Sequence, residues 1–168
     1  VGSEMCIRDR FPSFNSSIDR QTMKLIQKNF INLGIAVDTP QGLIVPNIKA
    51  ANTKSIREIS DDIVRLAELS KSRKVKVDDL KGATFTISSL GSFGGKFFTP
   101  IINPPEVAIL GISKTFQQYS LEDSSKLDTY LPISLSYDHR IINGVEGVQF
   151  TTRFCEILED LNFFERHF

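Results

Sequence analysis

The sequence has few of the residues that build disulfide frameworks or metal sites. Its 168 residues include two cysteines, Cys6 and Cys155, and two histidines, His139 and His167. Two cysteines so far apart in the chain fit neither a disulfide framework nor a thiolate metal site, which favours a reducing compartment. With only two imidazoles a zinc centre is not expected either, and we expect no metal.

An excess of charge of either sign is also missing. Twenty Lys and Arg residues balance twenty Asp and Glu residues, and no long run of one sign occurs. The electrostatic footprint of a protein that binds nucleic acid or an anionic membrane is therefore absent. No apolar stretch approaches the roughly 18 residues of a membrane span, and no signal peptide is visible. We expect neither nucleic acid nor a membrane as a partner.

The composition that is present suits one compact domain. Hydrophobic residues make up 40% of the chain, and at this length folding buries roughly 70% of the surface of the unfolded chain. The first ten residues, VGSEMCIRDR, follow neither a helical nor a strand period. They are similar to translated adaptor read-through, so we interpret residues 1–10 as a non-native leader and residues 11–168 as the domain. A native but disordered leader is the alternative.

Between residues 33 and 49 the sequence LGIAVDTPQGLIVPNIK predicts a β-hairpin. Two β-branched runs are joined by residues 38–42, in which Pro40 presets φ and Gly42 can supply a positive φ. Because Pro46 cannot donate to a ladder, we expect the second strand to be irregular, or to lie at a sheet edge, around that residue.

Residues 53–73 predict an amphipathic helix of about five turns. Ser55 and Glu58 are spaced as a capping box, and apolar residues recur every three or four positions. The members of this stripe are Ile56, Ile59, Ile63, Leu66 and Leu69. We expect the stripe to belong to the core, where it would cover a sheet.

The remaining elements predict an α/β fold. Strands are expected at residues 83–88, 107–112 and 131–137, with a polar hairpin-like connection at residues 117–128. A last helix is indicated by its apolar residues Val148, Phe154, Ile157, Leu158 and Leu161. Asn143 and Gly144 precede that helix as a possible cap. Together these elements give a mixed sheet of at least five strands with helices packed on it.

His139 lies in the stretch SYDHRIING, just beyond an apolar strand. A lone histidine is more often a satisfied surface or core residue than a catalyst. Successive strand residues point to opposite faces, so Asp138 and Arg140 cannot both face the same reactant as His139. We expect them instead to pin the strand end through ion pairs. Asn143 can either approach the imidazole or cap the last helix, and the sequence leaves both readings open.

Ser88 and Ser89 end a predicted strand beside a loop rich in Gly, Pro and Phe, SLGSFGGKFFTPIINPPE. A hydroxyl at this place could donate to a developing oxyanion, although serine pairs are also common at strand ends. Neither serine lies in a G-x-S-x-G elbow, which argues against a serine hydrolase. The chain has no P-loop, and GSFGG is too loose for a dinucleotide-binding fingerprint.

Three blocks of the sequence carry a family resemblance. They are GIAVDTPQGLIVP, FTISSLGSFGG followed by FTPIINPPEVAILGI, and DHRIING after an apolar strand. Over residues 11–168 the chain resembles the catalytic domain of the dihydrolipoamide acyltransferases, the E2 components of 2-oxo acid dehydrogenase complexes. The resemblance implies a chloramphenicol-acetyltransferase-like fold whose trimers build a large hollow core. It also implies that the N-terminal part of the domain is missing from this chain.

The same resemblance implies the site residues and the reaction. The histidine of the D-H-R motif, here His139, would be the general base, and Ser88, the first serine after FTI, would be the oxyanion donor. Asn143 stands at the acidic or amide position of the motif. An acyl group would pass between dihydrolipoamide and coenzyme A at a site between two subunits, with no metal. Phe98 falls where family members place an aromatic residue near the substrate channel, and core packing is its alternative role.

The partners implied are the E1 and E3 components and a lipoyl domain, whose lipoyl group this chain does not carry. The blocks resemble the acetyl-transferring, pyruvate-type members most, then the branched-chain and the succinyl types. A catalytically idle assembly core is an alternative, although the presence of both His139 and Ser88 argues against it. A condensation domain of peptide assembly lines would need a second histidine where Asp138 stands. We expect the bacterial cytoplasm as the location, with the mitochondrial matrix as the alternative.

Overall fold

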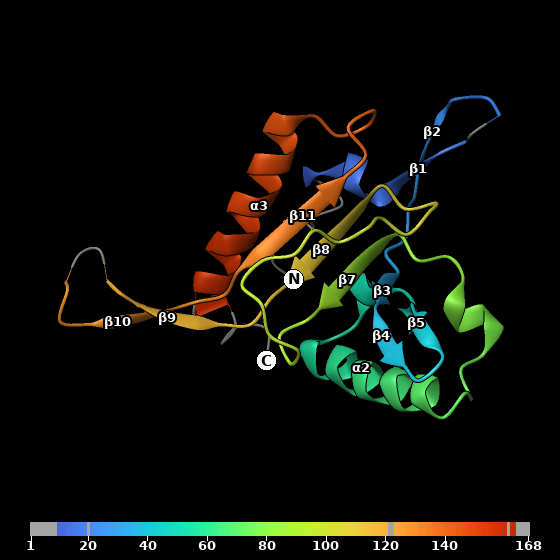
Figure 1. Cartoon of the computed structure of the whole chain (residues 1–168). Coiled ribbons are helices and arrows are strands. Elements are labelled where there is room, and N and C mark those ends of the chain that lie inside the picture. The colour runs from blue at the N-terminus through green and yellow to red at the C-terminus, as the bar shows by residue number, and fades with distance from the viewer. Residues whose placement is uncertain (1–9, 20, 121–122, 161, 164–168) are drawn as a thin grey trace.

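The computed structural model describes residues 10–19, 21–120, 123–160 and 162–163. Its centre is a mixed five-stranded sheet in the order β11-β8-β7-β3-β6 (Figure 1). The strands are β3 (Leu33–Ile35), β6 (Asn47–Ile48), β7 (Phe85–Ser89), β8 (Ala108–Ile112) and β11 (Ile133–Tyr137). Strand β7 runs parallel to β3 and β8, whereas β6 and β11 are antiparallel to their neighbours. The expected mixed sheet of at least five strands is confirmed.

Three two-stranded hairpins surround this sheet. They pair β1 (Ser16–Ile18) with β2 (Leu25–Gln27), β4 (Val37–Thr39) with β5 (Gly42–Ile44), and β9 (Phe116–Tyr119) with β10 (Leu127–Tyr130). The β4–β5 hairpin is the one expected from the sequence, with Gly42 at φ 118°. The β9–β10 hairpin confirms the expected connection, and it projects well away from the rest of the molecule (Figure 1). Short 3₁₀ turns lie at Pro12–Asn15, Ala51–Thr53 and Val77–Leu80.

The irregularity expected around Pro46 is present. The chain leaves β5 at Ile44 and resumes pairing at Asn47 in β6, which is an edge strand of the central sheet. The interpretation of residues 1–10 as a leader concerns, apart from Arg10, positions outside the described residues.

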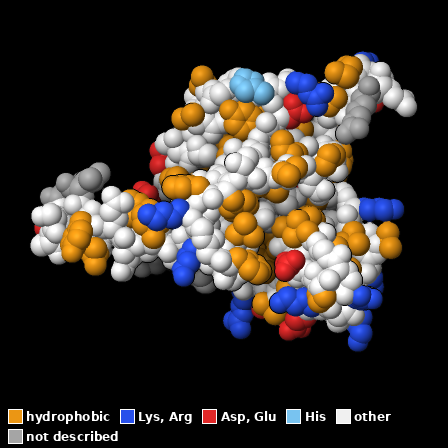
Figure 2. All heavy atoms as spheres, viewed as in Figure 1, with side chains coloured by type: hydrophobic (Ala, Val, Ile, Leu, Met, Phe, Trp, Pro, Cys, Tyr) orange, Lys and Arg blue, Asp and Glu red, His pale blue; other side chains and the backbone are white. Residues whose placement is uncertain are grey.

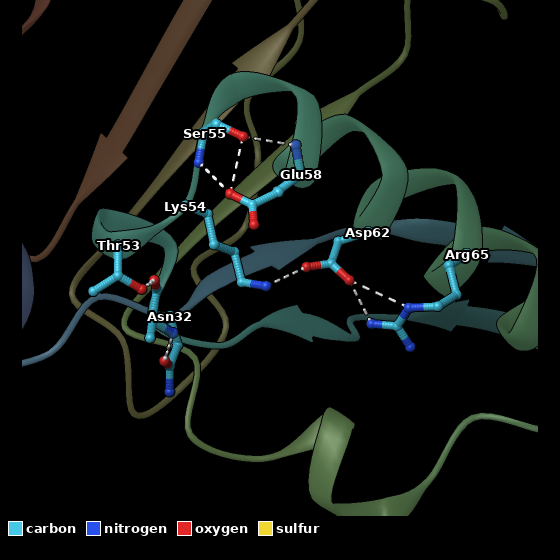
Figure 3. Close-up of polar contacts among 8 residues, drawn as sticks. Asn32, Thr53, Lys54, Ser55, Glu58, Asp62 and Arg65 are labelled. Carbon is cyan, nitrogen blue, oxygen red and sulfur yellow. Dashed lines mark hydrogen bonds and ion pairs between the residues drawn. The ribbon is translucent and has the colours of Figure 1, made fainter. Parts of the chain in front are cut away.

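Helix α2 (Ile56–Lys71) confirms the predicted amphipathic helix and its capping box. Ser55 Oγ accepts a hydrogen bond from the Glu58 backbone N–H, while the Glu58 carboxylate accepts one from the Ser55 backbone N–H (Figure 3). The apolar stripe is only partly in the core, because Leu66 is buried whereas Ile63 is 38% exposed.

Helix α3 (Gly144–Glu159) confirms the predicted last helix. Of the apolar residues that indicated it, Leu161 lies outside the described residues. Gly147 and Phe150 are the buried positions, whereas Val148 is 64% exposed. The reason is close packing on β11: a Cβ at position 147 would lie 2.9 Å from the Tyr137 ring. The helix therefore turns its smallest residue toward the sheet. Neither helix, nor any other in the described part of the chain, has the length and apolar character to cross a bilayer.

Both helices cover one face of the sheet (Figure 1). Between them lies an apolar cavity of about 290 Å³. Its lining includes Phe85, Ile87 and Leu110 from the sheet, Ile59 from α2 and Phe150 from α3. The rings of Phe14 and Phe150, which both line this cavity, stack with their centroids 4.2 Å apart. This helix-covered face holds the main apolar core.

Candidate functional site

His139 lies in the turn that follows β11. The strand pairing reaches Asp138, whose backbone N–H donates to the Val107 carbonyl at 2.8 Å. The chain then turns, because the backbone N–H groups of Ile141 and Ile142 both donate to the Asp138 carbonyl at 3.0 Å. The His139 side chain is exposed at this turn, and its ring centroid lies 5.8 Å from that of Tyr137. An exposed imidazole at a fixed strand end is accessible to a reactant.

The residues on either side of His139 bind each other. The Arg140 guanidinium donates to the two Asp138 oxygens, with Nε to Oδ1 at 2.9 Å and Nη2 to Oδ2 at 2.5 Å. These hydrogen bonds lower the pKa of the Asp138 carboxyl below its ordinary value. The predicted ion pair at the strand end is thus confirmed, and it closes the turn that presents His139.

Asn143 is the N-cap of α3. Its Oδ1 accepts a hydrogen bond from the Glu146 backbone N–H at 2.9 Å. The capping role that the sequence left open is therefore present. Because the cap fixes where α3 begins, Asn143 also fixes the end of the turn that carries His139.

Ser88 is half-buried on β7, in register with Gly111 of β8. Parallel neighbours in register direct their side chains to the same face of a sheet. A Cβ added to Gly111 would lie 2.7 Å from Cζ of Phe98 and 3.2 Å from Cγ of Pro100. Phe98 therefore packs on the strand next to Ser88, on the same face of the sheet, as its alternative packing role requires. This face is the one opposite the helices.

One chain does not bring Ser88 and His139 together. Ser88 pairs in register with Gly111 of β8, and Gly111 pairs in register with Ser134 of β11. His139 lies five residues beyond Ser134, which is about 15 Å or more along the strand direction, and two strands, about 10 Å, across the sheet. The arrows of β7 and β11 accordingly point to opposite ends of the sheet (Figure 1). Within one chain the two side chains are far beyond hydrogen-bonding distance.

The sequence reading missed a buried acid between these two ends. Glu106 is 6% exposed, and its carboxylate accepts hydrogen bonds from Thr86 Oγ1 at 2.6 Å and from Asn103 Nδ2 at 2.9 Å. Burial raises the pKa of the Glu106 carboxyl above its ordinary value, and the two hydrogen bonds partly oppose that shift. A signal was present in the sequence, because this glutamate directly precedes the apolar run VAILGI.

The described residues contain no group of three or more His, Cys, Asp and Glu side chains that could hold a metal ion. Cys155 is a half-buried free thiol on α3. Cys6 and His167 lie outside the described residues.

Comparison with known sequences agrees with these observations. The model of the 2-oxoacid dehydrogenases acyltransferase catalytic domain matches residues 6–165. The dihydrolipoyllysine-residue acetyltransferase component of the pyruvate dehydrogenase complex from Buchnera aphidicola is 44% identical over 156 residues. That alignment covers 92% of this chain but only 39% of the relative, so the chain spans about two fifths of its length.

Solved structures show the same fold. A structure of dihydrolipoamide acetyltransferase from Azotobacter vinelandii, from an investigation of a serine, a histidine and an asparagine in its catalytic mechanism, gives a TM-score of 0.85 at 44% identity. The cubic core of a pyruvate dehydrogenase multienzyme complex gives 0.85 at 45% identity. Both alignments cover 92% of this chain and 64% of the other. A chloramphenicol acetyltransferase, at 14% identity and a TM-score of 0.55, shares the fold alone.

Proposed function

Because the chain belongs to the family of 2-oxoacid dehydrogenase acyltransferase catalytic domains, we propose that it transfers an acyl group between dihydrolipoamide and coenzyme A. The general base is His139 and the oxyanion donor is Ser88. The observation that carries this proposal is that the chain holds both an exposed imidazole on a fixed turn and a half-buried hydroxyl beside Gly111.

The reaction exchanges one thioester for another. His139 accepts the proton of the coenzyme A thiol, and the sulfur attacks the carbonyl carbon of the acyl-lipoyl thioester. The carbonyl oxygen gains negative charge and accepts a hydrogen bond from the Ser88 hydroxyl. The bond between that carbon and the lipoyl sulfur then breaks, and the leaving thiolate takes the proton back from His139. Atoms and charge balance without a metal or an energy source.

We further propose that His139 of one protomer faces Ser88 of the next. The separation of the two residues within one chain supports this arrangement, because a single protomer cannot place both beside one carbonyl carbon. The exposure of apolar side chains in the loop after Ser88 also supports it: Phe93, Phe97 and Ile101 are 71%, 70% and 88% exposed. Large exposed apolar side chains close to one another are typical of an interaction surface.

The remaining surface fits an assembly better than it fits an isolated chain. Figure 2 shows hydrophobic side chains at the surface over the middle of the face in view and on the projecting β9–β10 hairpin. On that hairpin, Tyr119 and Leu127 are 64% and 54% exposed. A two-stranded hairpin alone is marginally stable in water, so it gains from a partner. We propose a homotrimer that joins a larger core, with a lipoyl domain and the E1 and E3 components as partners.

The relatives support a proposal for the acyl group. Those compared are acetyltransferase components of pyruvate dehydrogenase complexes, so we propose acetyl as the group transferred. Asn143 serves this mechanism through the cap that fixes the His139 turn, and Phe98 borders the Ser88 side of the substrate channel.

The test is a transfer assay on the full-length protein with dihydrolipoamide and acetyl-, isobutyryl- or succinyl-coenzyme A. We expect acetyl-coenzyme A to be the best donor. His139→Ala should lose most of the activity, and Ser88→Ala should lower kcat by about a hundredfold or more. Activity that survives His139→Ala unchanged would contradict the proposed base, and no activity in the unaltered protein would favour an idle assembly core.

A further inference from the structure

The hydroxyl of Thr86 is held in place from two sides. A Cβ added to Gly34, its in-register neighbour on β3, would lie 2.5 Å from Thr86 Oγ1, so only glycine fits there. On the other side Thr86 Oγ1 donates to Glu106 Oε2 at 2.6 Å. Thr86 precedes Ser88 by two residues, so both side chains lie on the same face, about 7 Å apart. Whatever fixes Thr86 therefore fixes β7 directly beside Ser88.

The second oxygen of the same carboxylate holds the loop that follows Ser88. Glu106 Oε1 accepts from Asn103 Nδ2 at 2.9 Å, and the Glu106 backbone N–H donates to the Asn103 carbonyl at 3.0 Å. At its other end this loop is tied to β8, because the Leu90 backbone N–H donates to the Ile112 carbonyl at 2.9 Å. Phe98 lies between these two anchors and packs on Gly111, the in-register neighbour of Ser88.

Glu106 also reaches the other end of the sheet. It lines a cavity of about 220 Å³ together with Asp138 and Arg140, the ion pair on either side of His139. The carbonyl of its neighbour Val107 accepts a hydrogen bond from the backbone N–H of Asp138, the residue that follows β11. One buried carboxylate thus links the strand of Ser88, the loop of Phe98 and the surroundings of the His139 turn.

We infer that Glu106 is a positioning residue: its buried carboxylate holds Thr86 and Asn103, and through them it fixes the Ser88 hydroxyl for catalysis. This inference rests on the proposed function, in which Ser88 donates to the oxyanion. A preorganised donor loses much of its effect when it is displaced by a fraction of an ångström, so loosening β7 or the loop lowers kcat. Glu106 touches no substrate in this account.

The test uses Thr86, because Thr86→Val removes the hydrogen bond to Glu106 and keeps the shape of the side chain. The matched control is Thr84→Val, since Thr84 is equally buried just before β7 but bonds to Asn32 instead. In the full-length protein we expect Thr86→Val to lower kcat about tenfold with an unchanged KM for coenzyme A, and Thr84→Val to change kcat less than about twofold. Thr86→Ser, which keeps the hydroxyl, should restore most of the activity.

A double-mutant cycle separates positioning from a general loss of structure. If Glu106 acts through Ser88, Thr86→Val should change kcat less than about twofold when Ser88 is already Ala. A second pair of variants alters Glu106 directly. Glu106→Gln can keep both partners, because its amide oxygen accepts from Asn103 and its N–H donates to the Thr86 hydroxyl, whereas Glu106→Leu can keep neither. We expect Glu106→Gln to retain clearly more activity than Glu106→Leu.

Three results would overturn the inference. If Thr86→Val had the same kcat as the unaltered protein, the hydrogen bond from Thr86 to Glu106 would not matter for catalysis. If Thr86→Val lowered kcat by the same factor whether residue 88 is Ser or Ala, Glu106 would have a purely structural role, while the proposed function stands. A Ser88→Ala variant with full activity would instead contradict the proposed role of Ser88, and with it the role of Glu106.

Discussion

The side chains of alternate residues of β7 and β8 point to opposite faces of the sheet, and different interactions hold the two faces. Ile87 and Leu110 line the apolar cavity beneath the helices. Ser88 and Gly111, the next residues along, lie on the other face beside Phe98. One face gains free energy by burying hydrocarbon, whereas the other is held by hydrogen bonds and close approaches at glycine. The face that carries the Ser88 hydroxyl thus depends on a few specific contacts.

The largest effect is expected on the helix-covered face. Leu110 is 1% exposed there, so Leu110→Ala should lower the free energy of unfolding by about 2 to 5 kcal/mol, measured by urea denaturation. Leu43 on β5 is 65% exposed and is the matched control, for which we expect less than about 0.5 kcal/mol. Equal losses at the two leucines would remove the distinction between core and surface.

On the opposite face the sensitive position is Gly34. A Cβ there would lie 2.5 Å from Thr86 Oγ1, so Gly34→Ala should destabilise by about 1 to 3 kcal/mol. It should also lower kcat, because it displaces the hydroxyl that Glu106 holds. Gly91→Ala is the control, since its Cβ would meet its nearest atom at 3.6 Å. A stable and fully active Gly34→Ala variant would contradict the tight packing of this face.

A smaller effect is expected at the turn of His139. Asn143→Ala removes the N-cap of α3 and should lower the free energy of unfolding by about 1 kcal/mol, which thermal melting can detect. Asn143→Asp keeps a capping oxygen, so it should retain both stability and substantial transfer activity. If Asn143→Asp lost as much activity as His139→Ala, the amide would have a specific catalytic role beyond the cap.

The smallest effect concerns two acids with opposite pH behaviour. Hydrogen bonds from Lys54 and Arg65 lower the pKa of Asp62 (Figure 3), whereas burial raises that of Glu106. The stabilisation by Asp62 is present at neutral pH and is lost as the pH falls through its lowered pKa. Glu106 behaves in the opposite way, because its protonated form is favoured by folding. Its contribution is complete below the ordinary value of 4.5 and is lost as the pH rises through its raised pKa.

The pH dependence of urea denaturation can separate these two acids. Compared with the unaltered protein, Asp62→Asn should lose less stability below about pH 4, and Glu106→Gln should gain less as the pH falls toward 4.5. The same slope in both variants would contradict the opposite environments of the two carboxylates.

Local patterns predicted most of the secondary structure. The capping box at Ser55, the turn at Gly42 and the break at Pro46 depend on a few neighbouring residues, so the sequence reveals them. The buried face of α3 could not be read from its apolar residues, because Val148 is exposed whereas the close approach of Tyr137 requires Gly147 there. That contact depends on tertiary packing, which a helical period does not contain.

The candidate site also combines residues that local motifs reveal with a contact that depends on tertiary structure. His139, Ser88 and the cap at Asn143 were found from motifs and spacing, and their catalytic roles stay predictions. The link from Glu106 to Thr86 joins residues 20 positions apart on neighbouring segments, and only the parallel pairing of β7 with β8 brings them together. Asp138 and Arg140 were expected to pin the strand end, and they do so by binding each other.

The central claim, a site shared by two protomers, is tested most directly by mixing two inactive variants. Full-length His139→Ala and Ser88→Ala chains, each tagged differently, are co-expressed in equal amounts and purified as mixed oligomers. If His139 of one protomer works with Ser88 of its neighbour, about a quarter of the sites in a random mixture hold both residues, and about a quarter of the acetyl-transfer activity should return. Mixed oligomers that stay as inactive as each variant alone would contradict the shared site.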